Sequence, residues 1–279
     1  ARRVEQLGVL AAGAPPSPDT VARAEMLARH LAEHLTALTA DEEGSTGDND
    51  VSPAVFCDAI KGLRFLPAHD PDAAAPPHGG TPRLCAFEEV GLHQDRRLLW
   101  TAAPLLRREH TPPRTHWAAL GVLQPPPPEL VLLHARRLTA AAPDAWPFDD
   151  EPIEETFGAL MAYLGERWHS LTAGVAASFA ALPLMLCGAA LVPARRVFRS
   201  SYASCQPLLQ PTHALSSTPL PADDLLTAMG STAAPTLHGY LSLLRELSGE
   251  CGAAARLNPS ERRALIAVLE LAAASPAFR

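Results

Sequence analysis

The sequence predicts an α+β fold made of two related modules in which short strands pack with short helices. Two apolar runs that end next to a proline, residues 63–68 and 190–193, each follow a segment with helical spacing. A short apolar run bounded by glycine and proline is typical of a buried strand. The same order of elements recurs along the chain, and the units are far longer than the periods of solenoid proteins. We therefore expect two packed α+β modules and not a superhelix.

The composition indicates a folded protein with short elements. Of the 279 residues, 47% are hydrophobic, which is sufficient for a sizeable core. Only 5% are aromatic and 28 are proline. The core should therefore consist mainly of Leu, Ala and Val, in helices and strands that proline often ends.

The charge pattern argues against a general nucleic-acid surface. The net charge is −7, and the arginines occur as scattered pairs, whereas phosphate binding uses clustered positive charge. The five cysteines are an odd number without a C-x-x-C motif, which suits a reducing compartment. Because no secretory leader is visible from Ala1 onward, we expect a cytoplasmic protein, and a piece of a longer chain.

Residues 170–194 carry no charge and are long enough to cross a membrane by length alone. Four helix-interrupting residues lie within them: Gly174, Pro183, Gly188 and Pro193. Many of the remaining residues are Ala, Ser or Thr, which insert weakly into lipid. We therefore predict no membrane association, but a short helix followed by buried strands at residues 182–186 and 190–193. Cys187 and Leu191 should then be inaccessible to solvent.

The first strong helix signal begins near residue 19. Asp19 or Thr20 is expected to cap the helix. The apolar positions at helical spacing are Val21, Met26, Leu27, Leu31, Leu35 and Leu38. The acidic residues 40–50 do not have the order of a calcium-binding loop and are interpreted as a flexible insertion.

The expected first module covers residues 51–152. Pro53 should begin a short helix that contains Phe56, Cys57 and Ile60, because proline suits a first helical turn. The strand 63–68 and a loop at 69–82 follow.

Two apolar segments come next, at residues 83–90 and 98–106. We interpret the first as a strand or edge segment that a polar, hairpin-like turn joins to the second. A short helix that Gly121 closes, a four-proline spacer and a helix at 129–139 complete the module. The alternative interpretation of the prolines is a P-x-x-P ligand for an aromatic groove.

The expected second module covers residues 153–279. Its first helix, 153–168, has one apolar face that consists of Phe157, Leu160, Met161, Leu164 and Trp168. After the predicted strands come a Ser/Thr/Pro-rich loop at 199–219 and a short helix that Gly230 ends. Two further helices are expected, at 237–247 and 260–274.

The modules are aligned on three recurring features. The apolar-Pro-Ala segments 65–68 and 191–194 correspond, and so do the turns at 120–121 and 229–230. The helices 153–168 and 260–274 close the two copies. The letters of residues 7–10 repeat those of 120–123, so residues 1–50 are interpreted as the end of a preceding unit.

The sequence supports no catalytic, cofactor-binding or metal-binding assignment. His30 and His34 are four residues apart on the expected helix, but their order H-L-A-E-H differs from the zinc motif H-E-x-x-H. His110 and His116 lie in a loop that lacks nearby thiols or carboxylates suited to a metal. The candidate nucleophiles Ser201, Ser204, Cys205 and Cys251 have no G-x-S-x-G elbow or cysteine-enzyme signature.

A resemblance to a known family rests on a series of motifs between residues 52 and 275. These are L-x-F-L-P-A, R-L-C-A-F-E-E-V-G-L, R-R-L-L-W-T-A-A-P-L-L, W-A-A-L-G-V-L-Q-P-P-P-P-E-L-V-L-L-H and A-L-V-P-A-R-R-V-F. In this order they resemble the large sacsin-type proteins, in the part of their repeats beyond the ATPase-like head. The N-x-x-x-D and D-x-G-x-G elements of that head are absent here, so no nucleotide-binding residue carries over.

The resemblance implies a non-catalytic scaffold or chaperone-associated module in protein quality control. Its partners would be other domains of the same large chain and protein clients or chaperones. The competing hypothesis is an enzyme with an unfamiliar site in the histidine-bearing loops 69–82 and 107–116. The two hypotheses differ in one structural respect, since an enzyme needs a pocket on which His, Asp and Arg side chains converge.

Overall fold

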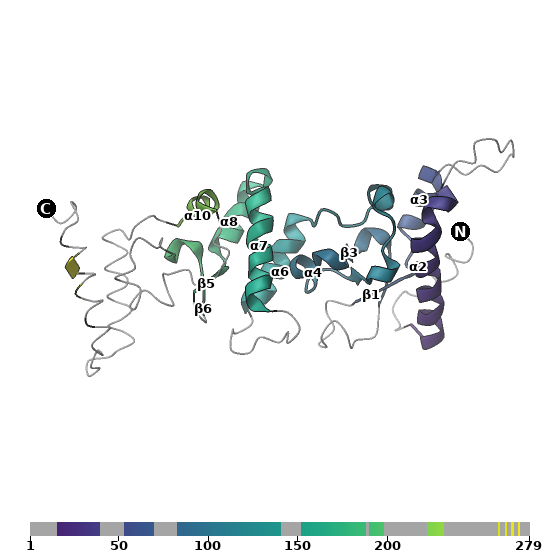
Figure 1. Ribbon diagram of the computed structural model, residues 1–279, viewed down its shortest axis with the longest axis horizontal. Helices are drawn as coiled ribbons and strands as arrows, with labels where there is room; N and C mark the ends of the chain where they lie inside the picture. The colour runs from purple at the N-terminus through teal and green to yellow at the C-terminus, as the bar shows by residue number, and fades with distance from the viewer. Residues whose placement is uncertain are drawn as a thin grey trace. The chain divides into compact units, whose positions relative to one another are not determined.

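The computed structural model describes residues 16–39, 53–69, 83–140, 152–187, 190–197 and 222–231, and five single positions of a helix between 262 and 273 (Figure 1). Helices predominate, and the strands are short and form small sheets, so the α+β prediction is confirmed. The chain divides into two compact units, unit 1 (Ala1–Leu138) and unit 2 (Thr139–Arg279). No helix in the described ranges is long and apolar enough to cross a membrane.

Unit 1 contains short strands, α-helices and 3₁₀ helices, the last labelled η. In chain order they are α2 (Pro18–Thr39), α3 (Pro53–Lys61), β1 (Leu66–His69), β2 (Arg83–Cys85), η2 (Phe87–Glu89), β3 (Gly91–Leu92), η3 (His93–Asp95), α4 (Arg96–Leu99), β4 (Leu105–Leu106), η4 (Arg108–His110), η5 (Arg114–His116), α5 (Trp117–Leu120) and α6 (Pro128–Ala140).

The cap of helix α2 lies two to three residues before the predicted caps. Pro18 is its first residue, and the Ser17 hydroxyl accepts a hydrogen bond from the Thr20 amide over 3.2 Å. The prediction that Asp19 or Thr20 caps the helix is therefore wrong. A proline has no amide hydrogen to satisfy, so Pro18 is well suited to the first turn that Ser17 caps.

The buried face of α2 differs in part from the predicted one. Leu31 and Leu35 are buried as expected, but the two preceding positions of the same face are Ala24 and Ala28. Met26 is 67% exposed, so its assignment to the apolar face was wrong. The spacing of four, three and four residues between the buried positions follows one helical stripe, which Met26 falls outside.

The sheet of unit 1 has the strand order β2-β1-β4-β3. Strand β1 pairs antiparallel with β2, with Leu66 opposite Cys85, and antiparallel with β4. Strand β2 lies at the edge, as predicted. Strand β1 begins at Leu66, later than the predicted residue 63, although the Phe65 amide already donates to the Cys85 carbonyl.

Strands β3 and β4 are parallel. The predicted hairpin-like turn between segments 83–90 and 98–106 is wrong, because β2 and β4, which lie in those segments, do not pair with each other. The chain returns from β3 through η3 and α4 before it enters β4. A Cβ atom on Gly91 would lie 2.6 Å from Leu99 Cδ1 and 3.1 Å from Leu105 Cδ2. Glycine at this position therefore allows α4 to pack directly on the strands.

The core of unit 1 joins α2 and α3 to the sheet. It contains Ala28, Leu31, Leu35, Cys57, Ile60, Phe65, Leu66, Ala68, Cys85, Phe87, Val90, Leu92, Leu106, Leu120 and Val122. Phe65 and Phe87 meet edge to face, with ring centroids 5.7 Å apart. Helix α2 thus shares this core, and the described part of residues 1–50 does not form a separate one.

The predicted short helix, proline spacer and following helix all occur. Gly121 ends α5 with φ of 73°, in the left-handed region that favours glycine. Pro126 is buried, and Pro128 is the first residue of α6, which extends to Ala140. The proline stretch is therefore partly packed inside the unit.

The described elements of unit 2 are α7 (Ile153–Arg167), η7 (Trp168–Ser170), α8 (Ala173–Ala181), β5 (Met185–Cys187), β6 (Ala190–Val192), η8 (Ala194–Arg196) and α10 (Asp223–Ala228). Four of the five predicted apolar positions of α7 are buried, and Trp168 is half-buried at the start of η7. The Thr172 hydroxyl caps α8 by accepting from the Val175 amide.

The uncharged stretch forms α8 and an antiparallel hairpin, in which Met185 pairs with Val192 and Leu186 with Leu191. The two predicted strands are therefore confirmed. Val192 is buried but Leu191 is half-exposed, so the expectation that Leu191 is inaccessible was wrong. The side chain of Cys187 lies outside the described residues.

The two units repeat one chain path. In unit 1, the hairpin β1–β2 leads into η2, and Val90 follows in extended conformation. In unit 2, the hairpin β5–β6 leads into η8, and Val197 follows in the same conformation. A helix precedes each hairpin, α3 in unit 1 and α8 in unit 2.

The helix ends of the two units also correspond. The amides of Gly121 and Val122 donate to Ala118 and Trp117, and those of Gly230 and Ser231 donate to Thr227 and Leu226. Both pairs are the hydrogen bonds of a Schellman motif, and Gly230 has φ of 92°. The predicted correspondence of the two glycine turns is therefore supported by geometry.

The predicted correspondence of segments 65–68 and 191–194 is wrong. It matches β1, a first hairpin strand, with the end of β6, a second hairpin strand. In the structure, the segment β2-Ala86-η2 of unit 1 instead corresponds to the segment β6-Pro193-η8 of unit 2.

Some predicted segments lie outside the described residues, namely 40–52, 70–82, 141–151 and 198–221, and the predicted helix 237–247. Ile266 and Leu269, on the predicted last helix, are 46% and 48% exposed.

Candidate functional site

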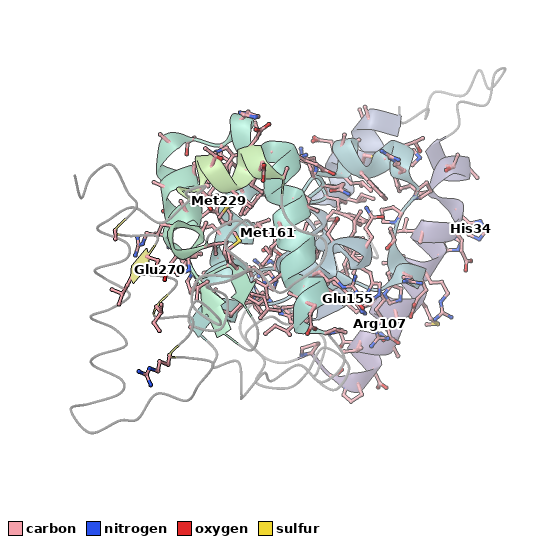
Figure 2. All side chains as sticks on the ribbon, turned by 60° about the vertical axis from the view of Figure 1, so that its left-hand side comes forward. His34, Arg107, Glu155, Met161, Met229 and Glu270 are labelled. Carbon is pink, nitrogen blue, oxygen red and sulfur yellow. The ribbon has the colours of Figure 1, made fainter. Side chains whose placement is uncertain are left out.

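The histidine pair of α2 lies on its exposed side. The ring centroids of His30 and His34 are 4.6 Å apart, and both side chains are exposed. Figure 2 shows His34 on α2. Glu33 Oε2 lies 3.8 Å from His34 Nε2. Within the described ranges no group of three His, Cys, Asp or Glu side chains could hold a metal, so no third ligand is placed beside this pair.

The histidines of the loop at 107–116 have different environments. His110 ends η4 and is 1% exposed, whereas His116 ends η5 and is half-buried. The rest of the competing hypothesis, residues 70–82, lies outside the described residues. The same holds for Ser201, Ser204, Cys205 and Cys251.

His134 of α6, which the sequence motifs did not identify, has hydrogen-bond partners at both ring nitrogens. Its side chain is fully buried, and its ring meets that of Trp100 edge to face at 5.7 Å between centroids. Nδ1 lies 2.6 Å from the Thr101 hydroxyl, and Nε2 lies 3.0 Å from the Arg97 carbonyl oxygen. His134 therefore joins α6 to α4 and the turn after it.

The partners of His134 determine its tautomer. A carbonyl oxygen only accepts, so Nε2 must carry the hydrogen and donate it to Arg97. Nδ1 then accepts from the Thr101 hydroxyl. Burial, together with the guanidinium of Arg137, lowers the pKa of His134 to about 3, against the opposing effect of the Arg97 carbonyl. The ring is neutral at pH 7 and has no access to a substrate.

The helical phase could have identified His134. The buried residues Val131, Ala135 and Leu138 of α6 lie on one stripe, and residue 134 is three after the first and four before the last. A histidine within such a stripe is buried, and its ring nitrogens need partners. The partners themselves lie more than thirty residues away, so the sequence pattern did not indicate them.

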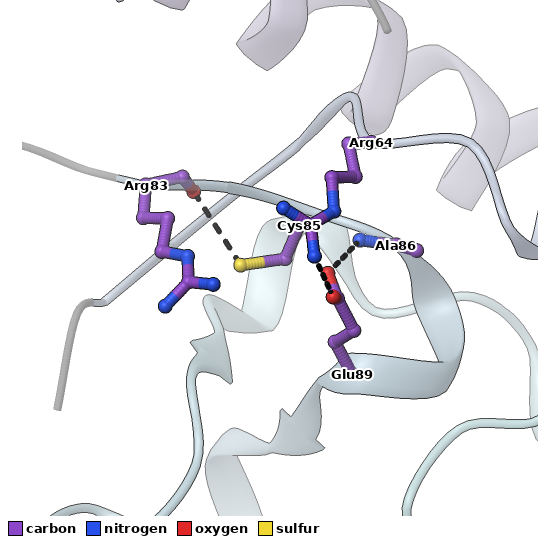
Figure 3. Close-up of polar contacts among 5 residues, drawn as sticks. All are labelled: Arg64, Arg83, Cys85, Ala86 and Glu89. Carbon is purple, nitrogen blue, oxygen red and sulfur yellow. Dashed lines mark hydrogen bonds and ion pairs between the residues drawn. The ribbon is translucent and has the colours of Figure 1, made fainter. Parts of the chain in front are cut away.

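A second polar group fixes the turn between β2 and η2 (Figure 3). Glu89 Oε2 accepts a hydrogen bond from the Ala86 amide over 3.0 Å, and Arg64 forms an ion pair with Glu89 Oε1. The Cys85 thiol points toward the Arg83 carbonyl oxygen at 3.8 Å. These contacts hold the start of η2 against the segment before β1.

The cysteines of unit 1 offer no reactive thiolate. Cys57 and Cys85 form no disulfide and are buried in the core. Burial raises the pKa of the Cys57 thiol above its usual value. A protonated thiol is a poor nucleophile and metal ligand, so the structure favours a packing role for Cys57.

Among the described carboxylates, Asp95 has the pKa that departs most from its usual value. Burial raises its pKa to about 6, against the opposing effect of a hydrogen bond from Gln94. Its Oδ2 atom is buried and has no hydrogen-bond partner in the described structure. Asp95 ends η3 and immediately precedes α4, so it lies on the segment that His134 contacts through Arg97 and Thr101.

Three of the described interior polar groups of unit 1 therefore have a structural role. His134 is neutral and bonded through both ring nitrogens, Glu89 caps η2, and Cys57 is protonated. A search of protein-family models, curated proteins and solved structures finds no match to the chain.

Proposed function

We propose that the chain is a non-catalytic scaffold and interaction module of a sacsin-like protein that acts in protein quality control. Four of the five motifs that carry the resemblance are structural elements of unit 1. L-x-F-L-P-A leads into β1, R-L-C-A-F-E-E-V-G-L spans β2 to β3, and the W-A-A-L-G segment forms α5 and its glycine end. These motifs form strands and helix ends of the fold, as expected for a protein whose role is structural.

The hydrogen bonds of the His134 ring support the non-catalytic part of the proposal. A catalytic base needs a free nitrogen within reach of a substrate proton. In His134 one nitrogen donates to Arg97, the other accepts from Thr101, and the ring is fully buried. The hydrogen bonds of His134 thus join elements of the fold and leave neither ring nitrogen free for catalysis.

The competing enzyme hypothesis receives no support from the loop at 107–116. His110 of this loop is 1% exposed, and its segment η4 packs against α2. The duplicated path instead favours an interaction role, because successive similar units present several surfaces along one chain. The partners under this proposal are other domains of the same large chain and unfolded clients or chaperones, without nucleic acid or membrane.

The proposal also includes a cytoplasmic location. The odd number of cysteines and the buried free thiols of Cys57 and Cys85 suit a reducing compartment.

A holding assay tests the proposal. The full chain is added to a chemically denatured, unrelated protein, and light scattering is followed during dilution into buffer. A scaffold that captures clients should suppress scattering in proportion to its molar ratio, because each molecule occupies a binding surface. Mg-ATP should not change the result, since the chain lacks the motifs that bind it.

An inert protein of similar size, added at the same molar ratios, is the control. Unchanged scattering at a large molar excess of the chain would contradict the proposal. Suppression that requires Mg-ATP, or complete suppression by a small fraction of one equivalent, would indicate a turnover mechanism and would also contradict it.

A further inference from the structure

His110 lies beneath helix α2 at the end of η4. Helix α2 packs against η4, and the His110 side chain is 1% exposed. Neither ring nitrogen has a hydrogen-bond partner within the part of the chain that the structure describes. This arrangement differs from that of His134, whose two ring nitrogens are both bonded.

The charges near His110 come from both packed elements. Glu25 and Arg29 belong to α2, and Arg107 and Glu109 lie next to His110 in its own segment. Arg107 donates to Glu25 Oε1 over 3.2 Å and lies 4.0 Å from Glu109 Oε1, so both carboxylates are already paired with it. The set has as many guanidinium groups as carboxylates, and none of the four donates to or accepts from the ring. A proton on His110 would therefore lack both water and a partner.

We propose that His110 is an acid-sensitive latch for helix α2: the uncharged imidazole lets the helix pack against η4, and proton uptake by the ring releases it. Release exposes the stripe of α2 that contains Ala28, Leu31 and Leu35, which belongs to the core of unit 1. This conformational control goes beyond the proposed scaffold function and does not depend on it.

The direction of the pH dependence follows from the environment of the ring. Burial is the main cause that places the pKa of His110 below its usual value. Glu109 and Glu25 oppose this shift, and Arg107 and Arg29 add to it. With α2 released, the ring is in water and its pKa returns to about 6.5. Acidification below about 6.5 therefore favours the released state, until the pH reaches the pKa of the packed state.

Amide hydrogen exchange on the full chain measures the release. The opening constant of each α2 amide is obtained after correction for its intrinsic exchange rate at each pH. It should rise by at most about tenfold per pH unit as the pH falls, which is the limit for one proton taken up per opening. The α8 amides are the internal control, because this helix of unit 2 contains no titratable side chain.

Matched variants identify the titrating group. His110→Phe and His110→Gln both remove the titration, the first with a ring and the second with a polar group, and each should make α2 opening independent of pH. The double variant His30→Gln/His34→Gln removes the exposed histidines of α2 and should retain the wild-type response.

The wild-type protein provides a test that does not require either His110 variant to fold. Protonation of the His110 ring, followed by the chemical shifts of its carbon-bound hydrogens, should coincide with opening of α2. Ring protonation without any change in the α2 amides would overturn the proposal. An acid response that persists in a folded His110 variant, or that disappears in the His30/His34 variant, would also overturn it.

Discussion

Histidine serves two different purposes in unit 1. His134 satisfies both ring nitrogens and connects α6 to the α4 segment, whereas His110 is buried without a described hydrogen-bond partner. Bonded buried polar groups add specificity to packing, and unbonded ones cost stability. The same side chain is thus a permanent connection at one position and, under our proposal, a reversible one at the other.

Replacement of His134 by alanine should lower the free energy of unfolding of unit 1 by about 2–4 kcal/mol, because it leaves a cavity and removes both hydrogen bonds. Urea denaturation measures the change. Leu133→Ala is the matched control, since Leu133 is the preceding residue of α6 and is 37% exposed. Its effect should stay within about 1 kcal/mol. Equal effects of the two substitutions would contradict the role assigned to His134.

At the level of elements, the sequence predicted helix positions better than strand pairing. The helical spacing of apolar residues, and the prolines and glycines at helix ends, located α3, α5, α6, α7, α8 and α10 within a few residues. Residues such as Pro53, Gly121 and Gly230 begin or end a helix through the conformation of their own backbone, which a local sequence pattern reports. The parallel pairing of β3 with β4 depends on Gly91 approaching Leu99 and Leu105, which no local pattern reports. The burial of His134 follows from helical phase, but its partners in the α4 segment do not.

The hairpin of unit 2 allows a test of which side chains point into the core. Val192, which is buried and pairs with Met185, should not tolerate aspartate. The Val192→Asp variant should lose several kcal/mol of stability, the general cost of burying an unpaired carboxylate. Leu191→Asp is the neighbouring control, and its cost should be smaller because Leu191 is half-exposed. Denaturation curves that rank the two variants in the opposite order would contradict the strand orientation.

At the scale of the whole molecule, each unit has its own buried residues. The core of unit 1 consists of residues between Ala28 and Val122, and α6 packs His134 on the same unit. A unit with its own core can fold independently of the rest of the chain.

A fragment of residues 1–140 should therefore fold and unfold cooperatively in urea. Residue 140 is chosen because α6 ends there, beyond the unit boundary at Leu138. Circular dichroism follows the transition. A second fragment that ends at residue 127, just before α6, should be less stable because it lacks His134. A gradual transition for the longer fragment would show that unit 1 needs residues beyond 140.

The duplicated path also affects synthesis on the ribosome, where the first hairpin emerges before the second exists. Two similar hairpins on one chain risk strand exchange, in which β6 would take the place of β2. The residue that follows the second strand of each hairpin differs between the units, and this difference disfavours the exchange. Ala86 donates its amide hydrogen to Glu89, but Pro193 has none to donate. Divergence at this position therefore favours the pairing of each hairpin with its own unit.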